Sequence, residues 1–184
     1  MQFITADGKT VFVDGVGVKH LKAHPDVSNL LPEAISKMII GDGLNKVQQA
    51  IEMSRVVGRA GLLDTTDTNL DTRINFAYRA ERDAPSPVVV NAVGKESTTV
   101  AVSVYFHKES GQWRLVTAFV GVPAPNEPFY YFDKNSWHYK DEERFKLCLD
   151  FWIKHALVYE PEISGEPFES TWRAELEKAK SKSE

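Results

Sequence analysis

The chain has 184 residues, of which 42% are hydrophobic and 26% charged, values close to those of folded globular proteins and far from those of disordered or fibrous chains. Its formal net charge of -4 at pH 7 excludes a general attraction of the whole molecule to nucleic acid, so any contact with RNA has to come from a local basic patch. The single cysteine, Cys148, excludes an internal disulfide and any metal centre built from several cysteines of this chain.

We expect one domain over residues 1–184, located in the cytoplasm. A chain of this length buries roughly 70% of the surface that its unfolded form exposes, so its core needs neither a metal nor a disulfide. The first residues lack a basic segment followed by an apolar stretch, and no run approaches the ~18 apolar residues of a membrane span. These features favour a cytoplasmic protein that makes no contact with a membrane.

The first third of the sequence predicts a hairpin followed by helices. Asp7-Gly8 lies between short β-forming stretches at 2–4 and 10–13, which is a hairpin pattern. A short helix from Val16 is expected to end at His24-Pro25, because proline disfavours helical geometry in the residue before it. Hydrophobic residues at helical spacing predict two further helices, over 30–39 and 44–57.

The middle of the sequence predicts an antiparallel sheet. Hydrophobic residues there recur with a period of two, which predicts strands over 74–78, 87–93, 100–106 and 113–120. Short turns such as Ser110-Gly111 join successive strands, where a parallel sheet would need crossover helices. Thr117 is expected on the same face of the last strand as Trp113, Leu115 and Phe119.

The final third predicts an amphipathic helix from Phe145 to Ala156, which the acidic residues 141–143 stabilise at its N-terminal end. A tail that is helical from about 167 and frays toward its end follows. We interpret Cys148, inside the amphipathic helix, as a buried apolar residue. The predicted fold class is therefore α+β, with N-terminal helices packed on a central antiparallel sheet and a C-terminal amphipathic helix.

His20 and His24 are the first candidates for a catalytic role. They are four residues apart and so share a helix face, and the neighbouring Lys19 and Lys22 disfavour the protonated imidazole, which suits a general base. The alternative is that either histidine only satisfies the helix end beside Pro25. The same lysines repel a dication, and a leucine follows His20 where the zinc protease motif has glutamate, so we expect no metal and no cofactor.

Other polar and aromatic residues are candidates for binding a phosphate or a base. Cations beside the first two central strands suit a phosphate, although a solvated strand end is the alternative; they are Arg73, Arg79, Arg82 and Lys95. Trp137 and His138, near the aromatic run 129–132, suit stacking on unpaired bases, and the alternative is that they belong to the core.

The order of these features resembles one superfamily of nucleases. The helix ending in His24-Pro25-Asp26, the basic residues on the following strands and the late strand Leu-Val-Thr-Ala-Phe at 115–119 are similar to the barnase, EndoU, colicin and RelE-like RNases, above all to their phage and polymorphic-toxin members. The similarity covers residues 10–121. The chain departs from the pattern in continuing Phe-Val-Gly where members often have a proline after the aromatic residue, and in the segment after Gly121.

The resemblance implies a metal-independent endoribonuclease that cleaves RNA by attack of the 2′-hydroxyl, giving a 2′,3′-cyclic phosphate. Carried onto this chain, it implies His20 or His24 as the general base, Arg79 or Lys95 as the cation, and Thr117 as the hydroxyl that positions the phosphate. A protein inhibitor would be a further partner. The alternative function is that of a non-enzymatic α+β protein that binds a protein partner through its aromatic segment 129–139.

Overall fold

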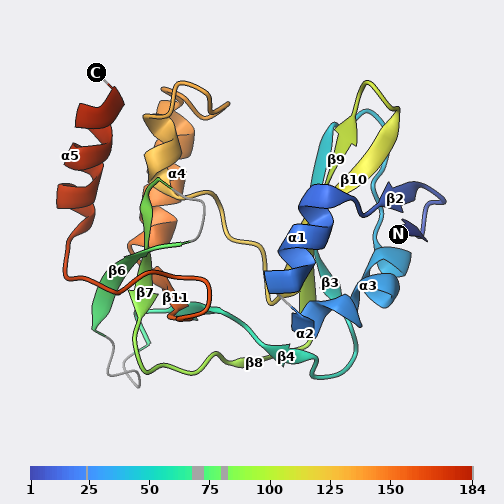
Figure 1. The fold of residues 1–184 in the computed structure, drawn as a ribbon, viewed down its shortest axis with the longest axis horizontal. Helices are drawn as coiled ribbons and strands as arrows, with labels where there is room; N and C mark the ends of the chain where they lie inside the picture. Colours follow the sequence, from blue (N-terminus) through green and yellow to red (C-terminus); the bar gives the residue numbers. More distant parts are fainter. Residues whose placement is uncertain (24, 68–72, 80–82, 184) are drawn as a thin grey trace. The chain divides into compact units, whose positions relative to one another are not determined.

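The computed structural model describes residues 1–23, 25–67, 73–79 and 83–183 (Figure 1). The chain forms two compact units, each built from two separate stretches: unit 1 comprises Met1–Gly61 and Lys95–Pro123, and unit 2 comprises Leu62–Gly94 and Ala124–Glu184. Both units contain helices and sheets, which confirms the α+β class. The single domain over residues 1–184 stays a prediction, and each unit is described below by itself.

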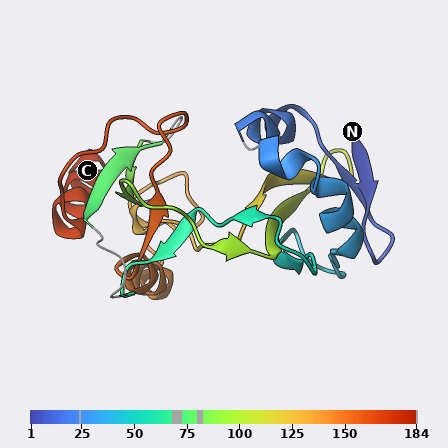
Figure 2. The same cartoon turned by 90° about the horizontal axis from the view of Figure 1, so that it is seen from below.

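Among its described residues, unit 1 has three helices and a five-stranded sheet. Its helices are α1 (Gly15–Ala23), α2 (Pro25–Ser28) and α3 (Leu31–Lys37). Its strands are β1 (Gln2–Ile4), β2 (Thr10–Phe12), β3 (Lys46–Glu52), β4 (Gly58–Arg59), β8 (Glu96–Ser97), β9 (Thr99–His107) and β10 (Gln112–Val120). The main sheet has the order β1-β2-β10-β9-β3 and is antiparallel except between β2 and β10. Figure 2 shows the short β4–β8 ladder apart from this sheet.

The turns of unit 1 form where the sequence predicts them. Gly8 has a φ of 79° in the turn between β1 and β2, and Gly111 has a φ of 65° between β9 and β10. Glycine adopts this left-handed backbone without steric cost, which explains the tight hairpins. The structure describes α1 up to Ala23 and α2 from Pro25, so the predicted helix end at His24-Pro25 involves a residue outside the described part of the chain; α3 lies within the second predicted helix.

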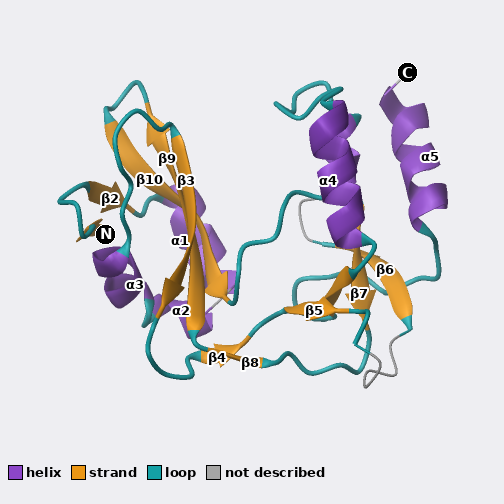
Figure 3. Ribbon diagram, turned by 180° about the vertical axis from the view of Figure 1, so that it is seen from behind, coloured by secondary structure: helices purple, strands orange, loops and turns teal. Residues whose placement is uncertain are grey.

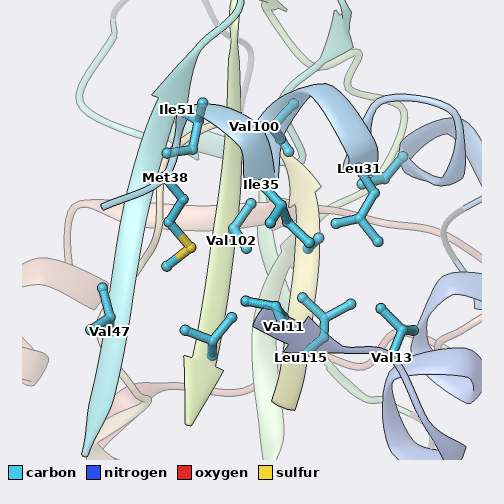
Figure 4. Packing of buried hydrophobic residues seen from close by; sticks show 14 of the residues in the cluster. Val11, Val13, Leu31, Ile35, Met38, Val47, Ile51, Val100, Val102 and Leu115 are labelled. Atoms are coloured by element: carbon cyan, nitrogen blue, oxygen red, sulfur yellow. The ribbon is translucent and has the colours of Figure 1, made fainter. Parts of the chain in front are cut away.

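The core of unit 1 lies between one face of the sheet and the helices. Leu31, Ile35 and Met38, from α3 and the residue after it, pack against Val102 of β9 and its neighbours (Figure 4). These side chains are almost completely buried, and burial of one such side chain is worth roughly 1.5–3 kcal/mol. The prediction that N-terminal helices pack on an antiparallel sheet is therefore confirmed for unit 1.

The predicted helix over 44–57 is wrong, because this stretch contains strand β3. Val47 and Ile51 are buried at a spacing of four, which fits a helix as well as a strand. The residue between them on the same strand face is polar: the Gln49 side chain donates to the Ile39 carbonyl oxygen at 2.5 Å and accepts from the Ile39 N–H at 3.1 Å. A polar side chain at this position conceals the period of two.

Unit 2 contains a second sheet and two longer helices. Its elements are β5 (Leu62–Asp64), β6 (Ile74–Tyr78), β7 (Pro85–Val89), the 3-10 helix η1 (Pro128–Tyr131), α4 (Glu142–Trp152), β11 (His155–Val158) and α5 (Trp172–Ser183). The sheet has the order β5-β11-β7-β6, and only the β7–β11 pair is parallel. The central strands predicted at 74–78 and 87–93 therefore belong to a different sheet from β9 and β10.

Helix α4 is the predicted amphipathic helix, with a different end. The Asp141 carboxylate accepts from the Arg144 backbone N–H at 3.0 Å and caps its start, and Cys148 and Trp152 are buried. The helix ends at Trp152 and the chain then enters β11, so the prediction of helix up to Ala156 is wrong. Apolar residues of β11 continue the helical spacing by chance. Among the described residues, no helix is long and apolar enough to cross a membrane.

Candidate functional site

The predicted site residues are divided between the two units. Unit 1 contains three of them: His20, Lys95 and Thr117. Unit 2 contains four: Arg73, Arg79, Trp137 and His138. His24 and Arg82 lie outside the described residues, as does the side chain of His20.

Thr117 lies on the face of the unit 1 sheet that points away from the helices, which we call the outer face. The pairing of β10 with β9 contains a bulge between Leu115 and Thr117, so the side chains after it are on the opposite face from the one that strict alternation predicts. Leu115 and Ala118 are fully buried, whereas Thr117 is half-buried. The prediction that Thr117 shares a face with Trp113 and Leu115 is therefore wrong.

The outer face carries polar and aromatic side chains in rows across the strands. In Figure 3, seen from behind, α1 and α2 lie behind β3, β9 and β10, so this face is turned toward the viewer. The register aligns Gln48, Ser103 and Thr117 in one row. The next row contains Lys46, Tyr105, Arg114 and Phe12. A hydroxyl, a cation and an aromatic ring thus lie on adjacent rows of one surface.

Two contacts fix how α1 lies along β10. Asp14, directly before α1, pairs with Arg114 at 2.9 Å. A Cβ added to Gly17 would lie 3.3 Å from the Leu115 carbonyl oxygen, so the helix and the strand touch there. The earlier residue, Asp14, contacts Arg114, and the later residue, Gly17, contacts Leu115. Helix α1 therefore runs in the same direction as β10. His20, one helical turn beyond Gly17, comes alongside the stretch of β10 that contains Thr117.

The edge of β10 that faces β2 is only partly paired with another strand. In the described part of the chain, β2 pairs with β10 only at Trp113 and Arg114, so the later residues of β10 have no strand partner on that edge. Helix α1 contacts β10. Helix α1 and β10 are thus neighbours in unit 1, with Gly17 beside Leu115 on the helix-covered face of the sheet and Thr117 on the outer face.

His107, Ser110 and Arg114 form a chain of polar contacts at the β9–β10 hairpin. His107 Nδ1 lies 2.9 Å from the Ser110 Oγ, and the Arg114 Nη2 donates to the same oxygen at 3.4 Å. Arg114 also pairs with Asp14, while its buried Nε has no hydrogen-bond partner among the described residues. The Nη1 and Nη2 atoms of Arg114 thus have the Asp14 carboxylate and the Ser110 hydroxyl as partners.

Sequence reasoning missed His107 and Arg114, although a signal was present. Both residues flank the predicted turn Ser110-Gly111, and a hairpin aligns residues on either side of its turn. The register pairs Arg114 with Tyr105 and Gln112 with His107, so counting outward from the turn places both side chains on one face. The bulge in β10, which places the Thr117 side chain on that face, has no comparable signal in the sequence.

Lys95 lies away from Thr117 in unit 1. Its backbone carbonyl accepts from the Ala60 N–H at 2.8 Å, at the end of the β4–β8 ladder. Ser103 is the strand partner of Thr117, and Thr99 is already about 13 Å from Ser103 along an extended strand. The geometry therefore favours Arg114 over Lys95 as a cation near Thr117.

The predicted residues of unit 2 have other surroundings. Arg73 pairs with Glu169 on the surface, and Arg79 forms an antiparallel bridge with Ser164. Trp137 is 70% exposed, and the Arg144 guanidinium lies 5.7 Å from its ring. His138 is buried, with its Nε2 at 3.2 Å from the Asn126 amide nitrogen. Of these residues, Trp137 offers an accessible ring for stacking.

Unit 2 also contains a cavity of about 550 Å³ that sequence reasoning missed. Its walls include Phe129, Glu127, Glu175 and Lys178. The two buried carboxylates have local partners: Glu127 accepts from the Ser86 hydroxyl at 2.8 Å, and Glu175 accepts from Lys178 at 2.6 Å. Both carboxylates thus stabilise unit 2 itself. Among the described residues, no group of three or more His, Cys, Asp or Glu side chains could hold a metal ion.

Charge is distributed unevenly between the units. Unit 1 has ten Lys and Arg residues against eight Asp and Glu residues, a formal +2, whereas unit 2 has twelve against eighteen, a formal -6. The acidity of the whole chain therefore belongs to unit 2. The unit that carries the outer face has the sign of charge that favours a phosphate backbone.

Comparison with known proteins gives no functional assignment. The sequence matches no family model and no curated protein. Among solved structures, the chain is similar to a conserved hypothetical protein from Toxoplasma gondii ME49, with 14% sequence identity and a TM-score of 0.47, covering 75% of this chain and 86% of that chain.

Proposed function

We propose that unit 1 is a metal-independent endoribonuclease and that its active site lies along β10, at the strand edge beside α1. The proposal is supported by the contact of α1, which contains His20, with β10, which contains Arg114 and Thr117. These residue types are the ones that transesterification of RNA needs: a base, a hydroxyl and a cation. The order of motifs in the sequence, similar to that of the barnase, EndoU, colicin and RelE-like RNases, supports the same reaction.

The roles follow from the chemistry of the step. His20 accepts the proton of the 2′-hydroxyl as its oxygen attacks the phosphorus. Arg114 stabilises the charge on the pentavalent phosphate through its guanidinium donors, and we propose it in place of Arg79 and Lys95. Thr117 donates a hydrogen bond that positions the phosphate. The products are a 2′,3′-cyclic phosphate and a free 5′-hydroxyl, formed without a metal or cofactor in the cytoplasm.

The experiment is cleavage of fluorescent single-stranded RNA in EDTA by the unaltered protein and by His20→Ala, Thr117→Ala and Arg114→Gln variants. We expect cleavage that survives EDTA and falls at least ~100-fold in the His20 and Arg114 variants. Thr98→Ala is a matched control for Thr117→Ala, because Thr98 is exposed and lies outside the proposed site. Cleavage that EDTA abolishes, or that all three variants retain, contradicts the proposal.

A second candidate function is a protein contact through unit 2. Trp137 and Leu147 are 70% and 69% exposed and so are accessible to a partner. This candidate gains support if the unaltered protein cleaves none of a broad set of RNAs. It predicts that Trp137→Ala weakens binding to a protein partner without changing the stability of the fold.

A further inference from the structure

The cavity of about 550 Å³ in unit 2 has no part in the reaction proposed above. Its walls are formed by the ends of β6 and β7, by η1 with the residues beside it, and by α5. Pockets that bind small molecules and cofactors have volumes of roughly 300–1,000 Å³. The cavity is therefore large enough for a ligand of its own.

Glu175 of α5 places a buried carboxylate in the wall of this cavity. The residue is 2% exposed, and its side chain accepts from the Ser170 hydroxyl at 2.5 Å and from the Lys178 ammonium at 2.6 Å. Within the described part of the chain, both of these hydrogen bonds are to the same oxygen, Oε1. Because a carboxylate accepts hydrogen bonds on both of its oxygens, Oε2 is left to accept from a ligand in the cavity.

The other buried residues of the lining favour a ligand with a positive charge. Glu127 is 6% exposed and is a second buried carboxylate in the cavity wall. Phe129 and Tyr130 of η1 also line the cavity, and the face of an aromatic ring attracts a cation. Beside two buried carboxylates an anion is strongly repelled, whereas a cation compensates their charge. The buried lining thus suits a cation that also has an apolar body.

The lysines of the lining do not reverse this preference. Lys134 and Lys182 are exposed, so water and salt screen their charges. The Lys178 side chain is 59% exposed and pairs with Glu175. The positive charges of the lining therefore lie toward solvent, and its buried charges are negative.

We propose that the cavity of unit 2 binds a small organic amine in its protonated form. The ammonium group of the ligand donates to Glu175 Oε2, and its apolar body packs against the rings of Phe129 and Tyr130. Lys178 competes with the ligand for the same carboxylate, because it already donates to Oε1. This site is separate from the ribonuclease site, which lies in unit 1.

The test uses three probes that share a phenyl ring and differ in the charge of their end group. They are 2-phenylethylamine, which carries an ammonium group at pH 7, the neutral 2-phenylethanol, and the anionic 3-phenylpropionate. Each probe is titrated into the unaltered full-length protein and followed by NMR. We expect the amine to bind saturably and at least ~10-fold more tightly than the alcohol, because a hydrogen bond between charged groups is stronger, and the propionate not to bind.

Three variants connect the binding to Glu175. Glu175→Gln keeps the shape of the side chain and removes its charge, and we expect it to bind the amine ~10-fold more weakly. Glu177→Gln is the matched control, because it removes the same charge from an exposed position of α5 outside the cavity lining. We expect Lys178→Gln to bind the amine at least ~3-fold more tightly, since the competing ammonium is gone. A thermal melt checks the fold of each variant.

The Lys178 variant keeps the test decisive if Glu175→Gln fails to fold, since a damaged fold does not produce a gain in affinity. Absence of saturable binding of the amine to the unaltered protein overturns the proposal. So does binding of the alcohol or the propionate as tight as that of the amine, equal affinity of Glu175→Gln and Glu177→Gln for the amine, or no gain in Lys178→Gln.

Discussion

Thr117 faces away from the core because β10 contains one residue more than its partner strand at that point. The extra residue, Val116, lies between Leu115 and Thr117, which both pair directly with β9. A bulge of this kind turns the following side chains to the other face of the sheet. Strict alternation, the only pattern visible in the sequence, therefore predicts the wrong face for Thr117, although it predicts the strand itself correctly.

Cys148 shows the opposite case, in which composition and position predict the environment of a residue. The sequence interpretation of a buried apolar thiol is confirmed, since Cys148 is 4% exposed in α4. Burial raises the pKa of its thiol, which lowers the fraction of reactive thiolate at neutral pH. An apolar, protonated thiol is a structural residue.

We expect Cys148 to react slowly with a disulfide reagent such as Ellman's reagent in the folded protein and rapidly in guanidinium chloride. The physical reason is twofold, because burial excludes the reagent and disfavours the thiolate. The measurement is the rate of colour release at pH 7.5 with and without denaturant. Equal rates in the two conditions would show that the thiol is accessible and contradict its buried position.

At the scale of elements, the sequence predicts those whose pattern is local. The β1–β2 hairpin, the β9–β10 hairpin and the capped start of α4 follow from glycine turns, alternation and acidic first-turn residues. Strand β3 was predicted as a helix because Gln49 replaces an apolar residue on its inner face, and its hydrogen bonds to Ile39 are a tertiary contact. Tertiary contacts of this kind leave no period in the sequence.

The β1–β2 hairpin is attached to the segment after α3 through Asp7. The Thr5 hydroxyl donates to the Asp7 carboxylate at 2.7 Å, and the Gly41 and Ile40 backbone N–H groups donate at 3.0 and 3.3 Å. These donors, the Thr5 hydroxyl first, lower the pKa of Asp7 from 3.8 to about 2. The carboxylate therefore stabilises the fold in its charged form.

This shift predicts how stability depends on pH. Because the pKa of Asp7 is lower in the folded state, its contribution is complete above the unfolded value near 3.8 and is lost as the pH falls toward 2. We expect Asp7→Asn to weaken the fall in stability between about pH 4 and pH 2, measured by urea unfolding across that range. Parallel pH profiles for the unaltered and variant proteins would contradict this role of the hairpin.

The contact between α1 and β10 is the element-scale feature on which the proposed site depends. Glycine at position 17 allows α1 to approach β10 this closely. A Cβ there would lie 3.1 Å from the Val13 Cγ1 and 3.3 Å from the Leu115 carbonyl oxygen. A larger side chain has to push the helix from the strand. Such a displacement moves α1, which contains His20, away from β10, which contains Thr117.

We expect Gly17→Val to lower the free energy of unfolding by about 1–3 kcal/mol, the usual cost of overpacking. Ribonuclease activity should fall further than stability explains, since fully folded variant at low temperature still has the displaced helix. Urea unfolding and RNA cleavage at 10 °C measure the two effects, with Gly15→Ala as the control, since a Cβ at Gly15 meets no atom within 4 Å. Normal activity in folded Gly17→Val would separate the helix position from catalysis.

At the scale of the whole molecule, the sequence predicts the α+β class but not the division into two units. Strands β6 and β7 have the same alternating pattern as β9 and β10, yet residues 62–94 fold with the C-terminal part of the chain. Alternation identifies a strand without identifying its partners, because pairing depends on contacts between distant residues. The predicted site residues consequently lie in two units.

The division also changes the meaning of the net charge. A formal charge of -4 for the whole chain argues against contact with RNA, but unit 1 alone has +2 and the acidic excess is in unit 2. Electrostatic attraction to a phosphate backbone acts over about 10 Å at 0.1 M salt, so the local charge around the outer face matters more than the total. The amino-acid composition alone does not show how charge is distributed between the two units.

The central claim is that His20 and Thr117, far apart in the sequence, act on one phosphate. The most direct measurement is a double-mutant cycle of kcat/KM for RNA cleavage in EDTA with His20→Ala, Thr117→Ala and the combined variant. Our account predicts that the combined loss is much smaller than the product of the two single losses, because residues of one catalytic unit are not additive. Two single losses that multiply in the combined variant, or an unaltered protein that cleaves no RNA, would contradict it.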